Sequence, residues 1–323
     1  MKARTFWAAL CLTAFCASLA RADIPPASAA DLSLSPQANP SPPVLLSTQS
    51  TEDQGVYTLP QSAQPGEGIN QGGANVELDA DYFNHYIYRG VDHSIGTQSP
   101  GGLFNTRAST LNLEIYTKLE FNLGSLPHPF VGLFSDVYDA DPTSRFQEIR
   151  PIYGAIWTIK PFTIEGGGNT YIYPDRRDLN TAEVYGKFTF DDAFLYRSDK
   201  PLLSPYMLGA YDYDKNNGWY LEWGVTHDLV LEDLGLTLTF QADMAYIIGY
   251  QQQFVFINET HDTGFQHYDV GLKALYSLNH LFQFSDRYGE FNLRGSFWYT
   301  GSINGDLTAD NVIWGGVGIG FSY

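Results

Sequence analysis

The last stretch of the chain alternates between hydrophobic and small or polar residues at a period of two. In residues 311–323 (NVIWGGVGIGFSY), one face of an extended strand carries Ile313, Val317, Ile319, Phe321 and Tyr323. The other face is mostly glycine and serine, and glycine weakens a strand unless the space is needed. A strand that is apolar outward and small or polar inward predicts the wall of a β-barrel in lipid. The alternative is an ordinary edge strand that ends in tyrosine.

The same alternation recurs along most of the chain in segments of about ten residues separated by turn residues. It is clearest in residues 110–123 (TLNLEIYTKLEFNL), where aliphatic residues alternate with asparagine, glutamate and lysine. We predict an all-β fold, a transmembrane antiparallel up-and-down β-barrel. Its twelve strands are predicted over residues 76–88, 110–123, 129–138, 147–159, 161–173, 181–191, 204–213, 219–230, 234–248, 266–278, 289–300 and 312–323. A strand number of ten or fourteen remains an alternative, because the links 192–203 and 279–288 are longer than is usual for the periplasmic side.

An even number of strands places both ends of the barrel on one side, which is the periplasmic side in bacterial barrels. Aromatic residues near the predicted strand ends suggest the two interfacial girdles of such a barrel. The residues assigned to these girdles are Tyr86, Tyr88, Tyr171, Tyr173, Trp219, Tyr299 and Tyr323. As aromatic residues they would also suit the core of a soluble barrel, which is the competing interpretation.

The region before the barrel has two parts. Residues 1–22 combine a basic start, an apolar run from Phe6 to Leu19 and an Ala-Arg-Ala end, which predicts a cleaved secretory signal peptide. Both cysteines, Cys11 and Cys16, lie in it, so the mature protein is expected to contain no disulfide. Residues 23–74 are rich in proline, serine and glutamine without periodicity, which predicts a disordered periplasmic leader. The barrel is predicted over 75–323.

Charge and hydropathy narrow the class further. The formal net charge is −18, from 18 Lys plus Arg against 36 Asp plus Glu, which argues against a nucleic-acid partner. After the signal peptide no apolar run is long enough for a membrane-spanning helix, so a helical membrane protein is excluded. Membrane-spanning strands give no such run, because their apolar and polar residues alternate and the hydropathy averaged over a sequence window stays low. We therefore expect the bacterial outer membrane as the location and its lipid as a partner.

The inward face of the predicted strands is charged, and acids outnumber bases on it. The candidate pore-lining residues are Glu77, Asp79, Asp81, Glu114, Lys118, Glu120, Glu165, Glu183, Lys187, Glu222, Asp243, Asp269, Lys273 and Arg294. Carboxylates around a lumen lower the barrier for cations and raise it for anions. This predicts a porin-like channel for small solutes or cations, since the surplus acids are expected to lack partners. The alternative is a structural network in which these charges pair and fill a narrow lumen.

No catalytic residue is predicted. The histidines and nearby serines form no G-x-S-x-G or comparable signature, so we expect no enzyme, although an outer-membrane hydrolase stays a weaker alternative. A metal site from Asp79, Asp81 and His85 would need ligands from a second strand, and none can be placed. We expect no metal and no cofactor.

Two short motifs resemble known outer-membrane sequences. Gly318, Phe321 and Tyr323 are spaced as in the carboxy-terminal signal of outer-membrane proteins. This resemblance implies the barrel assembly machinery as a partner. The match is partial, because Gly316 occupies a position where that signal has a polar residue. Asp81-Tyr82, Tyr88-Arg89-Gly90 and Ser94 resemble the first hairpin of the TorF-like putative porin family. His93-Ser94 and the long leader depart from that family. The resemblance implies an outer-membrane barrel with a channel function. Whether it forms a homo-oligomer stays open.

Overall fold

The computed structural model describes residues 49–51, 56–58, 73–92, 112–138, 146–174, 177–198, 200–250, 262–305, 307, 309 and 311–323. The predicted signal peptide and most of the leader lie outside these residues, so the boundaries at 22 and 74 stay predictions. Within the leader region, β1 (Gln49–Thr51) and β2 (Val56–Thr58) pair antiparallel, with Ser50 opposite Tyr57.

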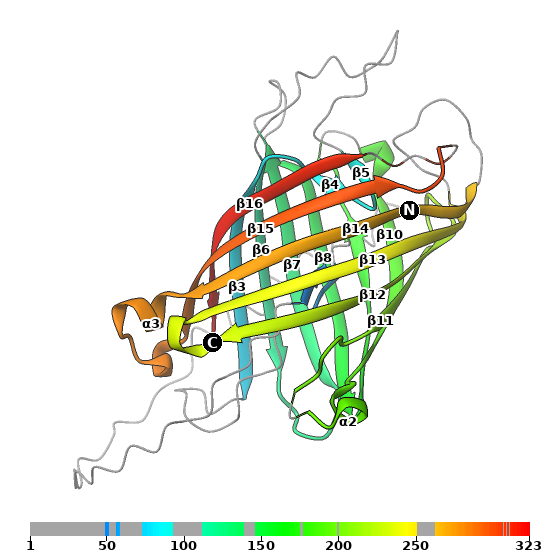
Figure 1. Ribbon diagram of the computed structural model, residues 1–323. Helices are drawn as coiled ribbons and strands as arrows, with labels where there is room; N and C mark the ends of the chain where they lie inside the picture. Colours follow the sequence, from blue (N-terminus) through cyan, green and yellow to red (C-terminus); the bar gives the residue numbers. More distant parts are fainter. Residues whose placement is uncertain are drawn as a thin grey trace, which may run out of the picture. The chain divides into compact units, whose positions relative to one another are not determined.

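Twelve strands form a closed antiparallel barrel, which confirms the predicted fold class and strand number (Figure 1). Each strand pairs with its neighbours in the chain, and the last pairs with the first. The strands are β3 (Ala74–Phe83), β6 (Asn112–Phe121), β7 (His128–Tyr138), β8 (Phe146–Ile159), β9 (Phe162–Tyr171), β10 (Thr181–Phe190), β11 (Tyr206–Asp212), β12 (Gly218–Leu231), β13 (Leu236–Tyr250), β14 (Asp262–Ser277), β15 (Glu290–Ser302) and β16 (Val312–Ser322).

The barrel closes where β16 meets β3. Phe321 lies opposite Leu78, and the pairing runs from Gly316 to Ser322. Just beyond the strand end, the Tyr323 N–H donates to the Val76 carbonyl at 2.8 Å, and the Val76 N–H donates to the Tyr323 carbonyl at 2.7 Å. The final residues of the chain therefore complete the ring of backbone hydrogen bonds, as their alternation predicted.

The two faces of the wall differ as a lipid-spanning barrel requires. On β16, Val317 is 65% exposed on the outer face, whereas Trp314 on the inner face is 3% exposed. On β6 the inner residues, from Asn112 to Glu120 at every second position, are all buried. Period-two alternation thus separates an apolar outer surface from a polar interior.

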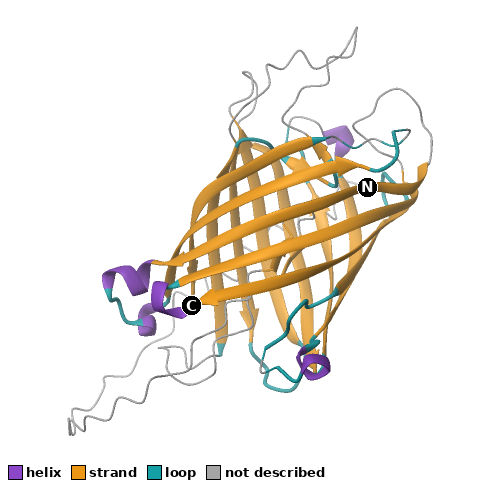
Figure 2. Cartoon of the chain, viewed as in Figure 1, coloured by secondary structure: helices purple, strands orange, loops and turns teal. Residues whose placement is uncertain are grey.

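Short helices join some strands. They are η1 (Arg177–Leu179), α2 (Ala193–Tyr196), η2 (Glu232–Leu234), α3 (Leu278–Phe282) and η3 (Asp286–Tyr288). Figure 2 shows α2 and α3 at separate points on the rim of the barrel end where the chain finishes. Among the described residues, no helix is long and apolar enough to cross a membrane.

The first strand is shorter than predicted. It was expected to run to Tyr88, but β3 ends at Phe83, where Asn84 exchanges hydrogen bonds with Gly315. The chain then forms a separate hairpin of β4 (Ile87–Tyr88) and β5 (Val91–Asp92). Arg89 and Gly90 make its turn with φ of 50° and 74°. Two residues in the left-handed region reverse the chain, so alternation cannot continue past this point.

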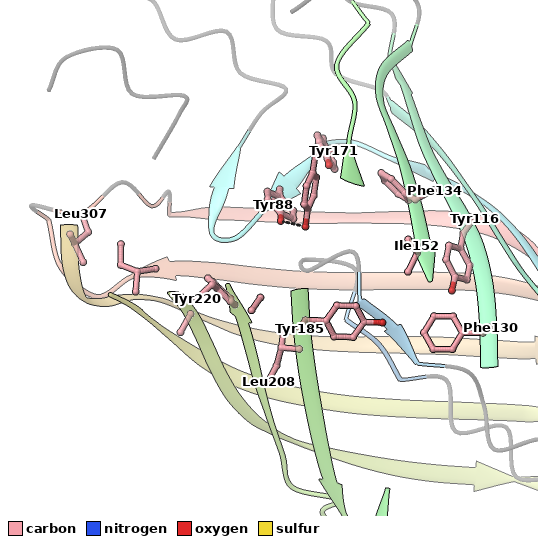
Figure 3. Packing of buried hydrophobic residues seen from close by; sticks show 14 residues of the cluster. Tyr88, Tyr116, Phe130, Phe134, Ile152, Tyr171, Tyr185, Leu208, Tyr220 and Leu307 are labelled. Carbon is pink, nitrogen blue, oxygen red and sulfur yellow. Dashed lines mark hydrogen bonds between the residues drawn. The ribbon is translucent and has the colours of Figure 1, made fainter. Parts of the chain in front are cut away.

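The assignment of aromatic girdles was wrong for four of the seven residues, one of which is Tyr173, partly buried against the inner cluster of the barrel. Tyr86, Tyr88 and Tyr171 are buried inside the barrel, in a cluster with Phe130, Phe134 and other inner residues (Figure 3). Tyr171 lies two residues after Asn169 on β9, so strand alternation places it on the same inner face. For Tyr86 and Tyr88 the reason is the hairpin, which turns inward. Trp219 and Tyr299 do face outward, with 45% and 36% of their surface exposed.

Candidate functional site: the barrel lumen

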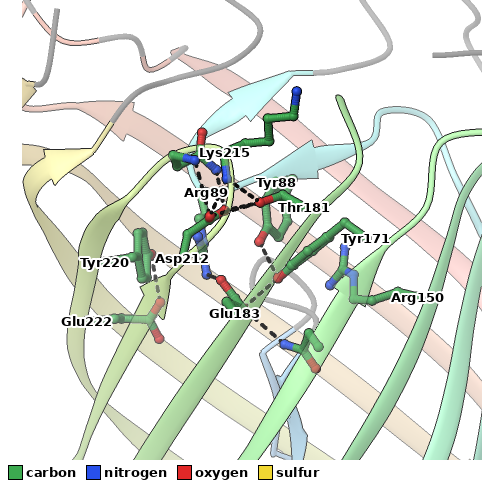
Figure 4. Close-up of polar contacts among 12 residues, drawn as sticks. Tyr88, Arg89, Arg150, Tyr171, Thr181, Glu183, Asp212, Lys215, Tyr220 and Glu222 are labelled. Atoms are coloured by element: carbon green, nitrogen blue, oxygen red, sulfur yellow. Dashed lines mark hydrogen bonds and ion pairs between the residues drawn. The ribbon is translucent and has the colours of Figure 1, made fainter. Parts of the chain in front are cut away.

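The β4–β5 hairpin contacts the opposite wall of the barrel through Arg89. The Arg89 guanidinium donates from Nη2 to Oε2 of Glu183 on β10 at 2.7 Å (Figure 4). Its carbon lies 4.4 Å from the centre of the Tyr220 ring on β12. The side chains of Arg89 and Glu183 are 4% and 0% exposed. A charge-assisted hydrogen bond and a cation–π contact, both shielded from bulk water, therefore hold the turn of the hairpin inside the barrel.

Tyr86 makes a second attachment of the hairpin, on β8. The Tyr86 hydroxyl donates to Glu148 Oε2 at 2.8 Å and accepts from Arg150 Nη2 at 3.1 Å. Arg150 also pairs with Glu148 through its Nε at 2.6 Å. All three side chains are buried. Tyr86 thus joins an ion pair that the barrel wall supplies.

Tyr88 makes a third attachment, on β9. Its hydroxyl donates to the Tyr171 hydroxyl at 2.7 Å, and that hydroxyl donates to Glu183 Oε1 at 2.6 Å. Glu183 therefore accepts two hydrogen bonds that connect it to the hairpin, directly from Arg89 and through Tyr171 from Tyr88.

Carboxylates lie side by side across four neighbouring strands. Asp81 on β3 is opposite Glu114 on β6, Glu114 is opposite Asp136 on β7, and Asp136 is opposite Glu148 on β8. We call these four residues the acidic row. Asn112 donates to both Glu114 and Asp136 at 3.1 Å, while Arg294 pairs with Asp81 and Arg150 with Glu148. Bases flank the row at its two ends.

Further carboxylates continue the charge around the lumen on β12, β13 and β14. Glu222 accepts hydrogen bonds from the hydroxyl groups of Tyr206 at 2.7 Å and Tyr220 at 2.9 Å. Asp243 and Asp269 are opposite each other in the β13–β14 register. Asp243 accepts from Gln241 Nε2 at 3.0 Å, and Asp269 accepts from Thr300 Oγ1 at 2.5 Å. Neutral donors therefore satisfy several of these acids.

The inner bases lie over aromatic rings as well as near acids. Lys118 Nζ is 4.3 Å from the Phe130 ring centre, Lys187 Nζ 4.5 Å from that of Tyr206, and Lys273 Nζ 5.0 Å from that of Trp298. Lys118 Nζ is also 3.9 Å from Glu120 Oε2. Lys118 thus lies between an aromatic and an acidic neighbour, and Lys187 is opposite Glu165 on β9.

All fourteen candidate residues lie on the inner face of the barrel, as strand parity predicted. Whether they line a conducting pore stays a prediction. One premise was wrong, because the surplus acids do have partners. Tyrosine, asparagine and threonine side chains donate to them, for example Tyr185 to Glu165 at 2.8 Å and Asn169 to Glu183 at 3.0 Å. Asp79 pairs with Arg294, and His85 bonds Asp92 at 2.6 Å.

The sequence interpretation missed the tyrosines of this network. Their parity was a usable signal, because Tyr185 lies between Glu183 and Lys187 on one face of β10, and Tyr220 shares its face of β12 with Glu222. No local pattern predicted the contacts of Arg89, since its partner Glu183 lies 94 residues away in the chain.

Some buried polar atoms on the inner face have no hydrogen-bond partner in the described part of the chain. They include Lys118 Nζ, Asp136 Oδ2, Glu165 Oε2, Asn169 Oδ1 and Gln241 Oε1. Buried polar groups without protein partners are ordinarily satisfied by water. Within the described ranges, no group of three or more His, Cys, Asp or Glu residues is placed to hold a metal ion. The expectations of no metal, no cofactor and no enzyme stay predictions.

No family model matches the chain, and no curated protein sequence matches it. Among solved structures, a KdgM porin in complex with disordered oligogalacturonate is similar over 77% of this chain and 99% of its own, at 8% identity and a TM-score of 0.41. A NanC porin is similar over 77% of this chain and 98% of its own, at 10% identity and a TM-score of 0.41. A Pseudomonas aeruginosa FadL homologue is similar over 77% of this chain and 90% of its own, at 10% identity and a TM-score of 0.37. The resemblance to the TorF-like family stays a prediction.

Proposed function

We propose that this protein is a bacterial outer-membrane channel through which small solutes diffuse passively, with a preference for cations. The observation that carries the proposal is the acidic row, together with Glu183, Glu222, Asp243 and Asp269 on other strands of the same lumen. Carboxylates facing one lumen create a negative potential that concentrates cations and excludes anions. The inner polar atoms without protein partners support a lumen that contains water.

The outer surface supports the membrane location. Residues facing outward at mid-strand are apolar and exposed, such as Val317 at 65%, Ile319 at 60% and Phe297 at 59%. Exposed apolar area on this scale is unfavourable in water and favourable against acyl chains. The closed ring of strands leaves no unpaired sheet edge, which a lipid environment demands.

The β4–β5 hairpin sets the expected size of the channel. Its three attachments, at Glu183, Glu148 and Tyr171, cross the lumen and narrow it. We therefore expect small conductance steps rather than those of a wide pore. The test is reconstitution of the refolded protein in planar bilayers. Small, reproducible steps are the expected result, and a folded barrel that gives no steps would refute the channel.

The same hairpin favours a second candidate, a non-conducting barrel with a structural or ligand-binding role. A lumen crossed by a buried hydrogen-bonded network can be closed to ions. The two candidates differ in what loosening the hairpin does. A channel narrowed by the hairpin conducts in the wild-type protein and more when the hairpin is released, whereas a closed barrel conducts only after release.

A further inference from the structure

The two longest links at the barrel end that carries the carboxyl terminus are folded, and each presents a group of exposed hydrophobic side chains. In the link between β10 and β11, Phe194, Leu195 and Tyr196 of α2 are 58%, 59% and 52% exposed. In the link between β14 and β15, Leu281, Phe282, Phe284 and Tyr288 are 50%, 59%, 58% and 63% exposed. Hydrophobic side chains gathered on a surface in this way mark an interaction site.

Buried polar side chains hold both links in shape, so these groups are not parts of loose loops. Asp192 is 2% exposed and accepts from the backbone N–H of Leu202 at 2.7 Å and of Leu203 at 2.9 Å. In the other link, Asn279 is 3% exposed, donates to the Gly289 carbonyl at 2.8 Å and accepts from the Phe291 N–H at 2.9 Å. Each link is therefore preorganised with its apolar side chains facing out.

The exposed groups continue the apolar outer surface of the barrel. Phe194 packs edge-on against Phe190 with ring centres 5.6 Å apart, and Phe190 packs against Phe162 at 5.4 Å. Phe162 is 36% exposed on the outer face of β9. Near α3, Phe291 on the outer face of β15 is 41% exposed and packs against Phe321 at 4.8 Å. The outer surface thus extends past the strand ends onto both links.

Basic side chains accompany both groups. Arg197 directly follows Tyr196, and Arg287 directly precedes Tyr288, and both arginines are exposed. Aromatic side chains next to arginine are typical of the boundary between acyl chains and phosphate headgroups, where each finds a suitable environment.

We propose that the described residues of these two links, 191–198 with 200–205 and 278–289, are membrane anchors that insert into the interfacial region of the adjacent phospholipid leaflet. The apolar side chains of α2 and α3 enter the acyl boundary, and Arg197 and Arg287 meet phosphate groups. This proposal rests on the proposed membrane location of the barrel. It adds two fixed points on the rim that would set the depth and tilt of the barrel in the bilayer.

The test uses single cysteines labelled with an environment-sensitive fluorophore in a cysteine-free full-length chain carrying Cys11→Ser and Cys16→Ser. Leu195→Cys and Phe282→Cys report on the anchors, with Tyr196→Cys and Phe284→Cys as a second pair if the first fails to fold. Val317→Cys is the control for the membrane-spanning wall. Asp233→Cys, an exposed residue on the same rim, is the control for water. Each protein is reconstituted in vesicles of phosphatidylethanolamine and phosphatidylglycerol containing lipids brominated at shallow or deep positions.

We expect shallow bromines to quench the anchor labels and deep bromines to quench the Val317 label, with the Asp233 label keeping its emission. Anchor labels that keep their emission while the Val317 label is quenched would overturn the anchors but leave the barrel in the membrane. This outcome would also follow if the links bound a second copy of the chain or another protein instead of lipid. A Val317 label that keeps its emission in a folded barrel would instead overturn the membrane location itself.

Discussion

Arg89 is the residue on which the position of the hairpin depends most. Its guanidinium bonds Glu183 and stacks on Tyr220, and both Arg89 and Glu183 are buried. Removing one partner of a buried ion pair leaves the other charge buried, which costs about 3–5 kcal/mol in soluble proteins. Loss of the Arg89–Glu183 pair would therefore destabilise both the position of the hairpin and the barrel wall around Glu183.

Arg89→Ala is therefore predicted to release the hairpin and to raise single-channel conductance above the wild-type value. Amide hydrogen exchange in residues 84–92 should become faster, because the hairpin loses its strongest attachment. Lys160→Ala, which removes an exposed base in the turn between β8 and β9, is the matched control and should change neither quantity. Unchanged conductance and exchange in the Arg89 variant would show that the hairpin is held by other contacts.

At the scale of single residues, the sequence predicted which face of a strand each residue occupies, because alternation determines it. It did not predict the hydrogen-bond partners of the side chains, because the tertiary structure determines them. Parity assigned Glu114, Glu222 and Asp243 to the inner face, and the structure agrees. It could not show that Tyr206 donates to Glu222, because that contact depends on how the adjacent strands β11 and β12 pair. Nor could it show that Gly90 approaches the His267 ring so closely that a Cβ atom would overlap it.

At the scale of the strand, the contrast between neighbouring residues gives a direct test of register. On β13, Ala242 faces outward, whereas Gln241 faces inward, 4% exposed, and bonds Asp243. Lysine at position 242 places a charge in the acyl chains, and lysine at position 241 places it beside a carboxylate.

Ala242→Lys is predicted to destabilise the barrel by roughly 2–4 kcal/mol if position 242 lies near the bilayer midplane. Gln241→Lys should cost less, because Asp243 offers a partner. Urea unfolding of both proteins in lipid vesicles measures the difference. Equal losses, or a larger loss for Gln241→Lys, would mean that the outer face of β13 is not in lipid.

The closing strand gives a second prediction at this scale. Deleting Phe321–Tyr323 removes the last pairings of β16 with β3, including both backbone bonds between Tyr323 and Val76. Unpaired backbone groups in lipid cost several kcal/mol each. We predict secretion of the truncated protein without assembly into the outer membrane. Phe321→Leu keeps the backbone and is the control, and normal outer-membrane levels of the truncated protein would contradict the prediction.

Strand positions were largely predictable, because alternation with turn residues locates them to within a few positions. The exception is β3, which was predicted to run to Tyr88. Its end depends on Asn84 bonding Gly315, which is 231 residues away. The acidic row could not be predicted either, since parity gives the face of each residue and only the register of four strands makes Asp81, Glu114, Asp136 and Glu148 neighbours.

At the scale of the whole molecule, the barrel combines an apolar exterior with an interior in which acids outnumber bases. At physiological ionic strength the screening length is about 8 Å, so in the proposed channel the carboxylates of a lumen narrowed by a hairpin would act on every ion that passes. Glu114 lies in the middle of the acidic row and keeps the bond from Asn112 if it is replaced by glutamine. Glu114→Gln therefore removes the negative charge while leaving the size and shape of the side chain nearly unchanged.

The most direct test of the proposed channel is therefore the reversal potential across a planar bilayer in a potassium chloride gradient. We predict a wild-type value of the sign that marks cation preference, and a shift toward zero in Glu114→Gln. Glu232→Gln, which removes an exposed acid from the rim, should leave the wild-type value unchanged. A wild-type reversal potential of the anion-selective sign, or one that Glu114→Gln does not move, would contradict the claim that the acids of the lumen select the permeating ion.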